Sequence, residues 1–173
     1  MVARKLIIFL SLKHPMNINF KPLQHIFTDV IPSPAVLKVI PDCRYQQFLI
    51  LADPVSRYLD IIGMKDYSSE ETIKCLNEWR GKMLKRGFEL FIHLRSDAGS
   101  NFTSQDFKDW CNKEYIKLSI AAPKHQEQNG FVERAYQTAS RMARAMLIKA
   151  HLKIEFYILA LMYACKILRV LPA

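Results

Sequence analysis

Two acidic residues, Asp97 and Glu133, are separated by 35 residues, and each lies in a local sequence that would fix its direction. Asp97 follows an apolar stretch, residues 91–94, that is typical of a strand, and Glu133 follows a polar loop, residues 123–129, that opens onto a helical pattern. A strand end and the first turn of a helix can hold two carboxylates rigidly at one point. Convergent carboxylate oxygens are the ligands that Mg²⁺ and Mn²⁺ require, so the pair predicts a divalent metal site.

The sequences around both acids carry a resemblance. The first reads Ser96-Asp97-Ala98-Gly99-Ser100-Asn101-Phe102, and the second reads Gln128-Asn129-Gly130-Phe131-Val132-Glu133. From about residue 21 to residue 172, the chain resembles the catalytic core of a retroviral or retrotransposon integrase, most closely a copia-type one. The resemblance implies a ribonuclease H-like fold and polynucleotidyl transfer on DNA: 3′-end processing followed by strand transfer.

A third carboxylate completes the site in that family, in the middle of the first strand. Asp29, in His25-Ile26-Phe27-Thr28-Asp29-Val30-Ile31, fits this place, and we assign it there. Asp53 is the alternative, but an Asp before Pro54-Val55-Ser56 has a sufficient local reason to exist, because Asp accepts hydrogen bonds within turns. The predicted catalytic and metal-binding set is therefore Asp29, Asp97 and Glu133, holding two Mg²⁺ or Mn²⁺ ions. Two such cations stabilise the entering and the leaving oxygen of a phosphoryl displacement.

The helix that begins near residue 131 carries a polar stripe. Glu133, Gln137, Ser140 and Arg144 recur at helical spacing and should share one face. We expect this helix face, and the loop before the helix, to contact DNA. The predicted nucleic-acid-binding residues are Asn101, Gln128, Asn129, Gln137, Arg141 and Arg144. An ordinary solvated helix face is the alternative for the stripe, and a local cap is the alternative for Asn101.

Bulk composition agrees with a polyanionic partner. Lys and Arg outnumber Asp and Glu by 25 to 16 in 173 residues, which gives a net charge of +9. The length suits one domain with a real core. We expect a poorly defined leader over residues 1–20 and the integrase-type core over residues 21–173. The apolar run of residues 156–165 is too short to cross a bilayer and predicts a buried helix, so no membrane partner is expected.

The four cysteines are far apart in the sequence and form no zinc-ligand spacing, so we expect free thiols and no zinc in this chain. A zinc module normally precedes the core in the family. Its absence here predicts an isolated core, a fragment or a decayed copy. No small-residue cleavage site follows the short apolar run near the start, so secretion is not expected. The family implies a nuclear location or a cytoplasmic retroelement particle, with homo-oligomers.

The order of periodic segments predicts the fold class. Strands are expected over residues 25–31, 46–53, 58–64, 89–94 and 117–121, and helices over residues 68–87, 103–114, 131–151 and 154–171. Three antiparallel strands followed by alternating helices and strands predict an α/β, ribonuclease H-like domain: a mixed five-stranded sheet with helices on both faces.

Two positions depart from the family pattern. Ala98 stands where Asn usually follows the second acid, and Tyr157 and Leu168-Arg169 stand where Trp and Asn are usual in the final helices. Two other interpretations therefore stay open beside an active transferase. One is a decayed or co-opted element that binds DNA without catalysis, and the other is a ribonuclease H-like nuclease of another lineage.

Overall fold

The computed structural model of the chain describes residues 21–32, 45, 47–121 and 130–170. The expected leader over residues 1–20 lies outside the described residues, as do Gln128 and Asn129.

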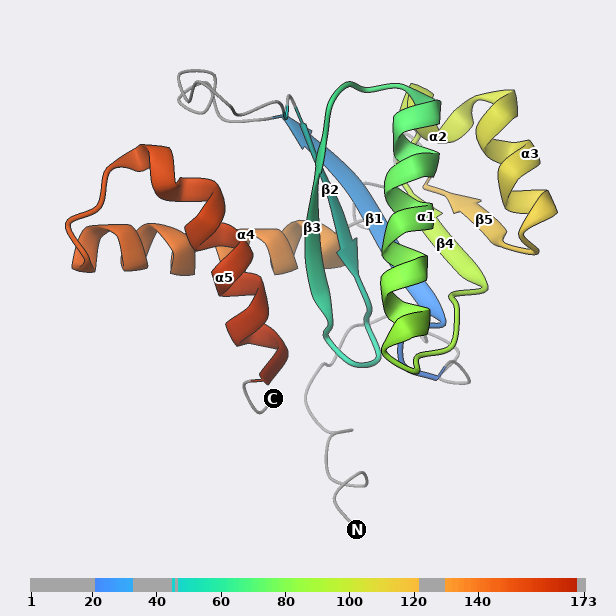
Figure 1. Ribbon diagram of the computed structural model, residues 1–173. Coiled ribbons are helices and arrows are strands. Elements are labelled where there is room, and N and C mark those ends of the chain that lie inside the picture. The colour runs from blue at the N-terminus through green and yellow to red at the C-terminus, as the bar shows by residue number, and fades with distance from the viewer. Residues whose placement is uncertain (1–20, 33–44, 46, 122–129, 171–173) are drawn as a thin grey trace, which may run out of the picture.

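The described residues form a mixed five-stranded sheet (Figure 1). Its order is β3-β2-β1-β4-β5. Antiparallel pairing joins β1 to β2 and β2 to β3, and parallel pairing joins β1 to β4 and β4 to β5. The strands are β1 (His25–Pro32), β2 (Gln47–Ala52), β3 (Leu59–Met64), β4 (His93–Ser96) and β5 (Lys117–Ile120). The predicted fold class is confirmed.

Strand β2 shows why both faces of the sheet must be covered. Phe48 and Ile50 are buried in one hydrophobic cluster, while Leu49 and Leu51 are buried in the other. Successive side chains of a strand point to opposite faces, so an apolar residue at every position requires a hydrophobic layer on each side.

The first layer contains α1 (Ser69–Lys85), α2 (Ser100–Thr103) and α3 (Gln105–Lys113). Helix α1 begins where the Ser68 hydroxyl accepts the amide hydrogen of Glu71 at 3.1 Å, a side-chain cap. Trp79 of α1 and Phe107 of α3 are buried in this layer, together with Phe91 from the loop before β4.

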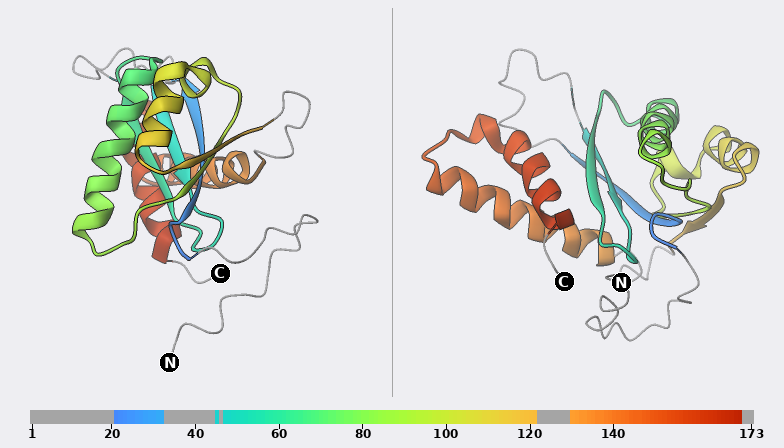
Figure 2. Two further views of the ribbon diagram at one scale, coloured as in Figure 1. Left: turned by 90° about the vertical axis from the view of Figure 1, so that its right-hand side faces the viewer. Right: turned by 60° about the horizontal axis from the view of Figure 1, so that its bottom comes forward.

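The second layer contains α4 (Gly130–Lys149), the short η3 (Ile154–Phe156) and α5 (Tyr157–Val170). Figure 2 shows α4 and α5 on one side of the sheet and α1 with α3 on the other. The far ends of α4 and α5 extend beyond the sheet (Figure 1). A hydrogen bond of 2.8 Å between the Ser140 and Tyr157 hydroxyls joins the two helices.

Three element predictions need correction. The fourth strand begins at His93, because Phe91 turns into the core against Trp79 instead of pairing in the sheet. Helix α3 is capped by Ser104, which accepts from the Phe107 amide at 3.2 Å, and Thr103 belongs to the preceding α2. Helix α5 buries only one face: Tyr157, Leu161, Ala164 and Cys165 are buried, whereas Leu159, Met162 and Tyr163 are exposed.

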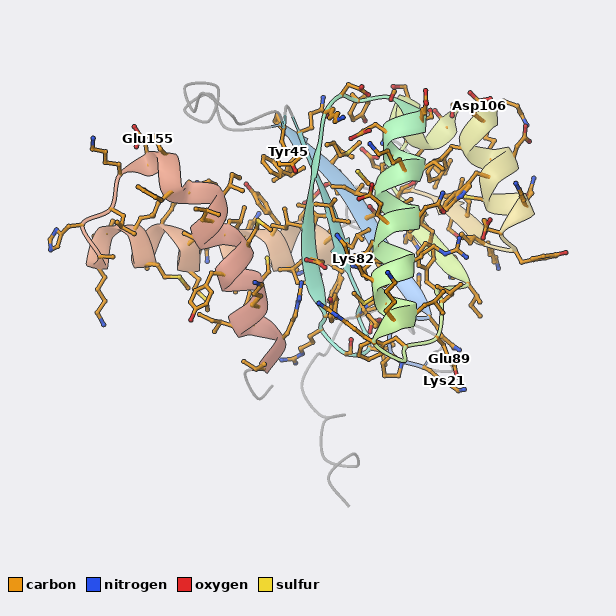
Figure 3. The ribbon with its side chains drawn as sticks, in the orientation of Figure 1. Lys21, Tyr45, Lys82, Glu89, Asp106 and Glu155 are labelled. Carbon is orange, nitrogen blue, oxygen red and sulfur yellow. The ribbon has the colours of Figure 1, made fainter. Side chains whose placement is uncertain are left out.

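Asp60 on the edge strand β3 connects the two layers. Its carboxylate forms an ion pair of 2.6 Å with Arg169 of α5 and accepts a 3.0 Å hydrogen bond from the Trp79 indole of α1. At the lower end of the molecule, an ion pair of 2.8 Å joins Lys21 to Glu89 (Figure 3). Among the described helices, none has the length and apolar character needed to span a membrane.

Candidate active site

The register of β1 against β4 places Asp29 beside Asp97. The parallel pairing matches Phe27 with Arg95, and two further residues along each strand reach the two acids. Neighbouring strands lie about 4.8 Å apart, so the carboxyl groups project from adjacent positions on the same face of the sheet.

Asp97 lies directly after β4, where the backbone turns into α2. Its carboxylate accepts the Gly99 amide hydrogen at 3.1 Å, and Ser96 before it is fully buried. The local turn therefore fixes the direction of the Asp97 side chain. Asp29 accepts the amide hydrogen of Val30 at 2.8 Å.

Glu133 lies in the first turn of α4 and is exposed. Helix α4 packs on the face of the sheet that carries Phe27, and the Phe27 and Phe131 rings contact each other with centroids 5.6 Å apart. This contact brings the start of α4 toward β1, and with it the third acid.

The charges of the three acids act on one another. The pKa of Asp29 is raised from 3.8 to about 6, first by burial and then by the negative charge of Asp97, with a smaller contribution from Glu133. The Val30 amide acts in the opposite direction. The negative charges beside Asp29 therefore disfavour its ionised form, and a bound cation would relieve that effect.

A ready-made metal cage is absent from the described residues: no three His, Cys, Asp or Glu side chains lie close enough together to hold an ion. The donor chemistry nevertheless fits a hard divalent cation, because Asp29 and Asp97 offer neighbouring carboxylates and Glu133 acts on the same charge.

Asp53 has a different environment. Its side chain is 0% exposed, and its carboxylate accepts hydrogen bonds from the backbone amides of Leu23, Val55 and Ser56 and from the Ser56 hydroxyl. These donors occupy the carboxylate within the turn between β2 and β3. The structure thus gives Asp53 a structural task and leaves Asp29 as the acid beside Asp97.

Asn101 lies in α2 and is only 1% exposed. Its amide nitrogen donates to the Thr72 hydroxyl of α1 at 3.1 Å. The predicted phosphate contact therefore needs correction: in this structure the side chain joins α2 to α1 and offers no surface to a nucleic acid.

The polar face predicted on α4 is only partly exposed. Gln137, Arg141 and Arg144 are exposed, as the prediction of a DNA-contacting face requires. Ser140 is buried against Tyr157 of α5 and leaves the stripe. Contacts of Gln128 and Asn129 lie outside the described residues.

Two residues near the acids were missed by sequence reasoning. Arg95 precedes Asp97 by two positions on β4 and thus faces the same side of the sheet, a signal that strand alternation offers. Its guanidinium lies 5.7 Å from the centre of the Phe27 ring. Tyr67, in the loop before α1, lies close enough to Asp97 and Asp29 that both raise the pKa of its hydroxyl, after the larger effect of burial. No sequence pattern indicates that proximity.

No sequence-family profile matches the chain. It is 29% identical over 134 residues to the Pro-Pol polyprotein of feline foamy virus, which covers 77% of this chain and 11% of the polyprotein. It is 25% identical over 126 residues to the retrovirus-related Pol polyprotein from transposon TNT 1-94 of Nicotiana tabacum, covering 73% of this chain and 9% of that protein. The chain thus spans about a tenth of the length of these relatives.

Solved structures with the same fold are retroviral integrases. The HTLV-2 integrase catalytic core domain in complex with magnesium superposes with a TM-score of 0.57 at 21% identity, covering 83% of each chain. An integrase chain of the simian T-cell lymphotropic virus intasome, in complex with PP2A regulatory subunit B56 gamma, gives a TM-score of 0.62 at 19% identity, covering 83% of this chain and 47% of that one.

The structural likeness agrees with the mixed five-stranded sheet described above. The copia-type assignment stays a prediction. The chain is thus similar in sequence to retroviral and retrotransposon Pol polyproteins, and it has the fold of retroviral integrase catalytic cores.

Proposed function

We propose that the chain is a metal-dependent polynucleotidyl transferase core that processes DNA 3′ ends and joins them to a target strand. The observation that carries the proposal is the placement of Asp29 and Asp97 at neighbouring positions on one face of the sheet, with Glu133 in the first turn of the helix that packs on that face. Neighbouring carboxylates that disfavour each other's charged form are suited to holding a cation.

In this proposal the side chains have distinct tasks. Asp29 and Asp97, on neighbouring strands, hold one divalent cation between them, and Glu133 completes a second position from α4. Bound Mg²⁺ or Mn²⁺ would stabilise charge on the entering and leaving oxygens of the phosphodiester. The Gly99 amide keeps the Asp97 carboxylate in its direction, and burial of the strands beneath keeps both aspartates from moving apart.

DNA binding in this proposal rests on charge. The net charge of +9 and the exposed Arg141 and Arg144 on α4 support phosphate contacts beside Glu133. Because no described element is a dedicated base reader, the contacts are expected to be mostly to the backbone.

A second copy of the chain is the proposed protein partner. HTLV-2 integrase cores have been solved in dimeric and trimeric forms. Exposed apolar side chains on α5, including Leu159, Met162 and Tyr163, support self-association here.

The decisive test compares wild-type protein with Glu133→Gln on a short duplex, with Mg²⁺ and with Mn²⁺. The amide keeps the size of the side chain but removes its charge, so cleavage and joining are expected to fall at least about 100-fold while the fold and DNA affinity are retained. Glu78→Gln is the matched control, since Glu78 is an exposed glutamate on α1 in the opposite layer.

The outcomes separate the candidate functions. Undiminished cleavage by Glu133→Gln would remove that residue from the mechanism. A folded wild-type protein that binds DNA but cleaves with neither cation would instead favour the decayed or co-opted element, with Ala98 beside the acids as the first position to examine.

A further inference from the structure

Tyr67 lies in the loop between β3 and α1. Its side chain is 36% exposed, so the ring is held by the protein while part of it faces solvent. Its hydroxyl and a carboxylate oxygen of Asp97 both lie beside Gly99, which places the hydroxyl next to the acidic site.

The contact with Gly99 locates the hydroxyl more closely. A Cβ atom added at Gly99 would overlap the Tyr67 hydroxyl and would lie 2.8 Å from the Asn101 side-chain oxygen and 3.1 Å from the Asp97 carboxylate. Gly99 has φ of −57°, a value that any residue adopts. The tyrosine hydroxyl occupies the room that a side chain at position 99 would take, so a larger residue there would have to displace it.

The loop that carries Tyr67 is anchored on both sides. Before the tyrosine, the Lys65 amide donates to the Glu71 carboxylate at 3.2 Å, and after it the Ser68 amide donates to Asp66 at 2.8 Å. A hydrogen bond of 2.6 Å between Ser69 and Ser104 then joins the start of α1 to the start of α3. The tyrosine thus sits on a preorganised support, as a group that must meet a substrate should.

A polar atom beside the Tyr67 hydroxyl lacks a partner within the described part of the chain. It is the buried side-chain oxygen of Asn101. The orientation of the Asn101 amide is set, because the Thr72 hydroxyl donates to the Ser68 carbonyl and so accepts from the amide nitrogen. A phenol hydroxyl beside two carboxylates is the neutral donor of the site.

We propose that Tyr67 contacts the DNA substrate, donating a hydrogen bond from its hydroxyl to a non-bridging oxygen of the phosphodiester that reacts beside Asp97. This inference rests on the proposed transferase function. The phosphodiester is an anion and the acids repel it, so a neutral donor near Asp97 orients it without adding charge.

The first test is Tyr67→Phe, which removes the hydroxyl and keeps the ring. Single-turnover cleavage of a saturating duplex is expected to fall about ten- to one-hundredfold, the value of one hydrogen bond to a charged group. Thermal stability and cation binding are expected to be unchanged. Tyr115→Phe is the control, because Tyr115 is 90% exposed and lies before β5, at the opposite end of the parallel strands from Asp97.

A second test distinguishes contact with the phosphate from a merely structural role. Duplexes carry a phosphorothioate at the scissile position, as separated diastereomers, and are cleaved with Mn²⁺. Sulfur is a weak hydrogen-bond acceptor, so one diastereomer is expected to slow wild-type protein about tenfold more than it slows Tyr67→Phe. Each protein is compared with itself on two substrates, so any loss of folding cancels.

Every outcome decides the inference. Non-additive losses for one diastereomer support the contact. Additive losses, or Tyr67→Phe cleaving as fast as wild type, overturn the contact while the transferase function stands. An inactive, folded wild-type protein overturns both, and the Glu133→Gln comparison identifies that case.

Discussion

Asp29 on β1 and Asp97, directly after β4, occupy matching positions along two neighbouring parallel strands. Their negative charges therefore repel each other when both carboxyl groups are ionised. The strands beneath them are buried and hydrogen-bonded, and neither acid can retreat without disturbing the sheet. The folded chain therefore carries an electrostatic cost that the unfolded chain does not.

Asp29→Asn should stabilise the metal-free protein at neutral pH. The folded-state pKa of Asp29 is about 6, above its ordinary value of 3.8, so the folded state binds more protons between these values and stability falls as pH rises through them. Above pH 6 the variant is expected to gain on the order of 1–2 kcal/mol, after discounting for solvent screening. Chemical denaturation at pH 8 and at pH 4 measures the difference. A gain of equal size at both pH values would contradict the electrostatic cause.

Cation binding should depend on pH through the same carboxyl group. A divalent ion must displace the proton of Asp29, so Mn²⁺ or Mg²⁺ affinity is expected to rise about tenfold per pH unit below 6 and to level off above it. Isothermal titration calorimetry between pH 5 and 8 records this curve. Asp29→Asn should abolish the tight site, and a pH-independent affinity would exclude Asp29 as a ligand.

Asp53→Asn should have the opposite effect on stability from Asp29→Asn. The buried Asp53 carboxylate accepts three backbone amide hydrogens and one hydroxyl, and an amide group would turn a donor toward some of them. The expected loss is about 3 kcal/mol at neutral pH. Equilibrium unfolding in urea measures it, and a neutral substitution would show that this turn does not depend on the carboxylate.

The two aspartates illustrate which parts of the fold and the site could be predicted from the sequence alone. Alternating apolar residues and the Pro54 turn sufficed to predict β2 and β3, and flanking motifs sufficed to select Asp97 and Glu133 as candidates. The choice of Asp29 over Asp53 could be proposed from the sequence, but only the register of β1 against β4 shows that Asp29 lies beside Asp97. Asn101 looked like a surface residue because burial by α1 is a tertiary property, and Tyr67 was missed because its proximity to Gly99 depends on how two loops pack.

Gly99→Ala tests that packing directly. The added methyl group would overlap the Tyr67 hydroxyl and crowd Asn101 and Asp97, so a loss of about 1–3 kcal/mol in stability is expected. In the Tyr67→Phe background the overlap is removed, and the same substitution should cost less. The double-mutant cycle is read from unfolding free energies, and strictly additive losses would mean that the two residues do not touch.

DNA affinity should respond to salt through the arginines of α4. Arg141→Ala and Arg144→Ala are each expected to reduce the slope of log affinity against log salt by about one, the effect of losing one phosphate contact. Fluorescence anisotropy from about 50 to 200 mM salt gives the slopes. Lys82→Ala is the control, on α1 in the opposite layer (Figure 3). Equal effects from all three variants would indicate diffuse attraction instead of a binding face.

The three acids are carried by different elements. Asp97 follows β4 and turns into α2, whereas Glu133 comes with α4, whose packing partners are β1, β2 and α5. Opening of the α4–α5 hairpin would move Glu133 and leave Asp29 and Asp97 on the sheet, at less than the full free energy of unfolding. We expect contacts that hold this hairpin closed, from DNA or another protomer, to increase the time for which Glu133 stays near the two aspartates.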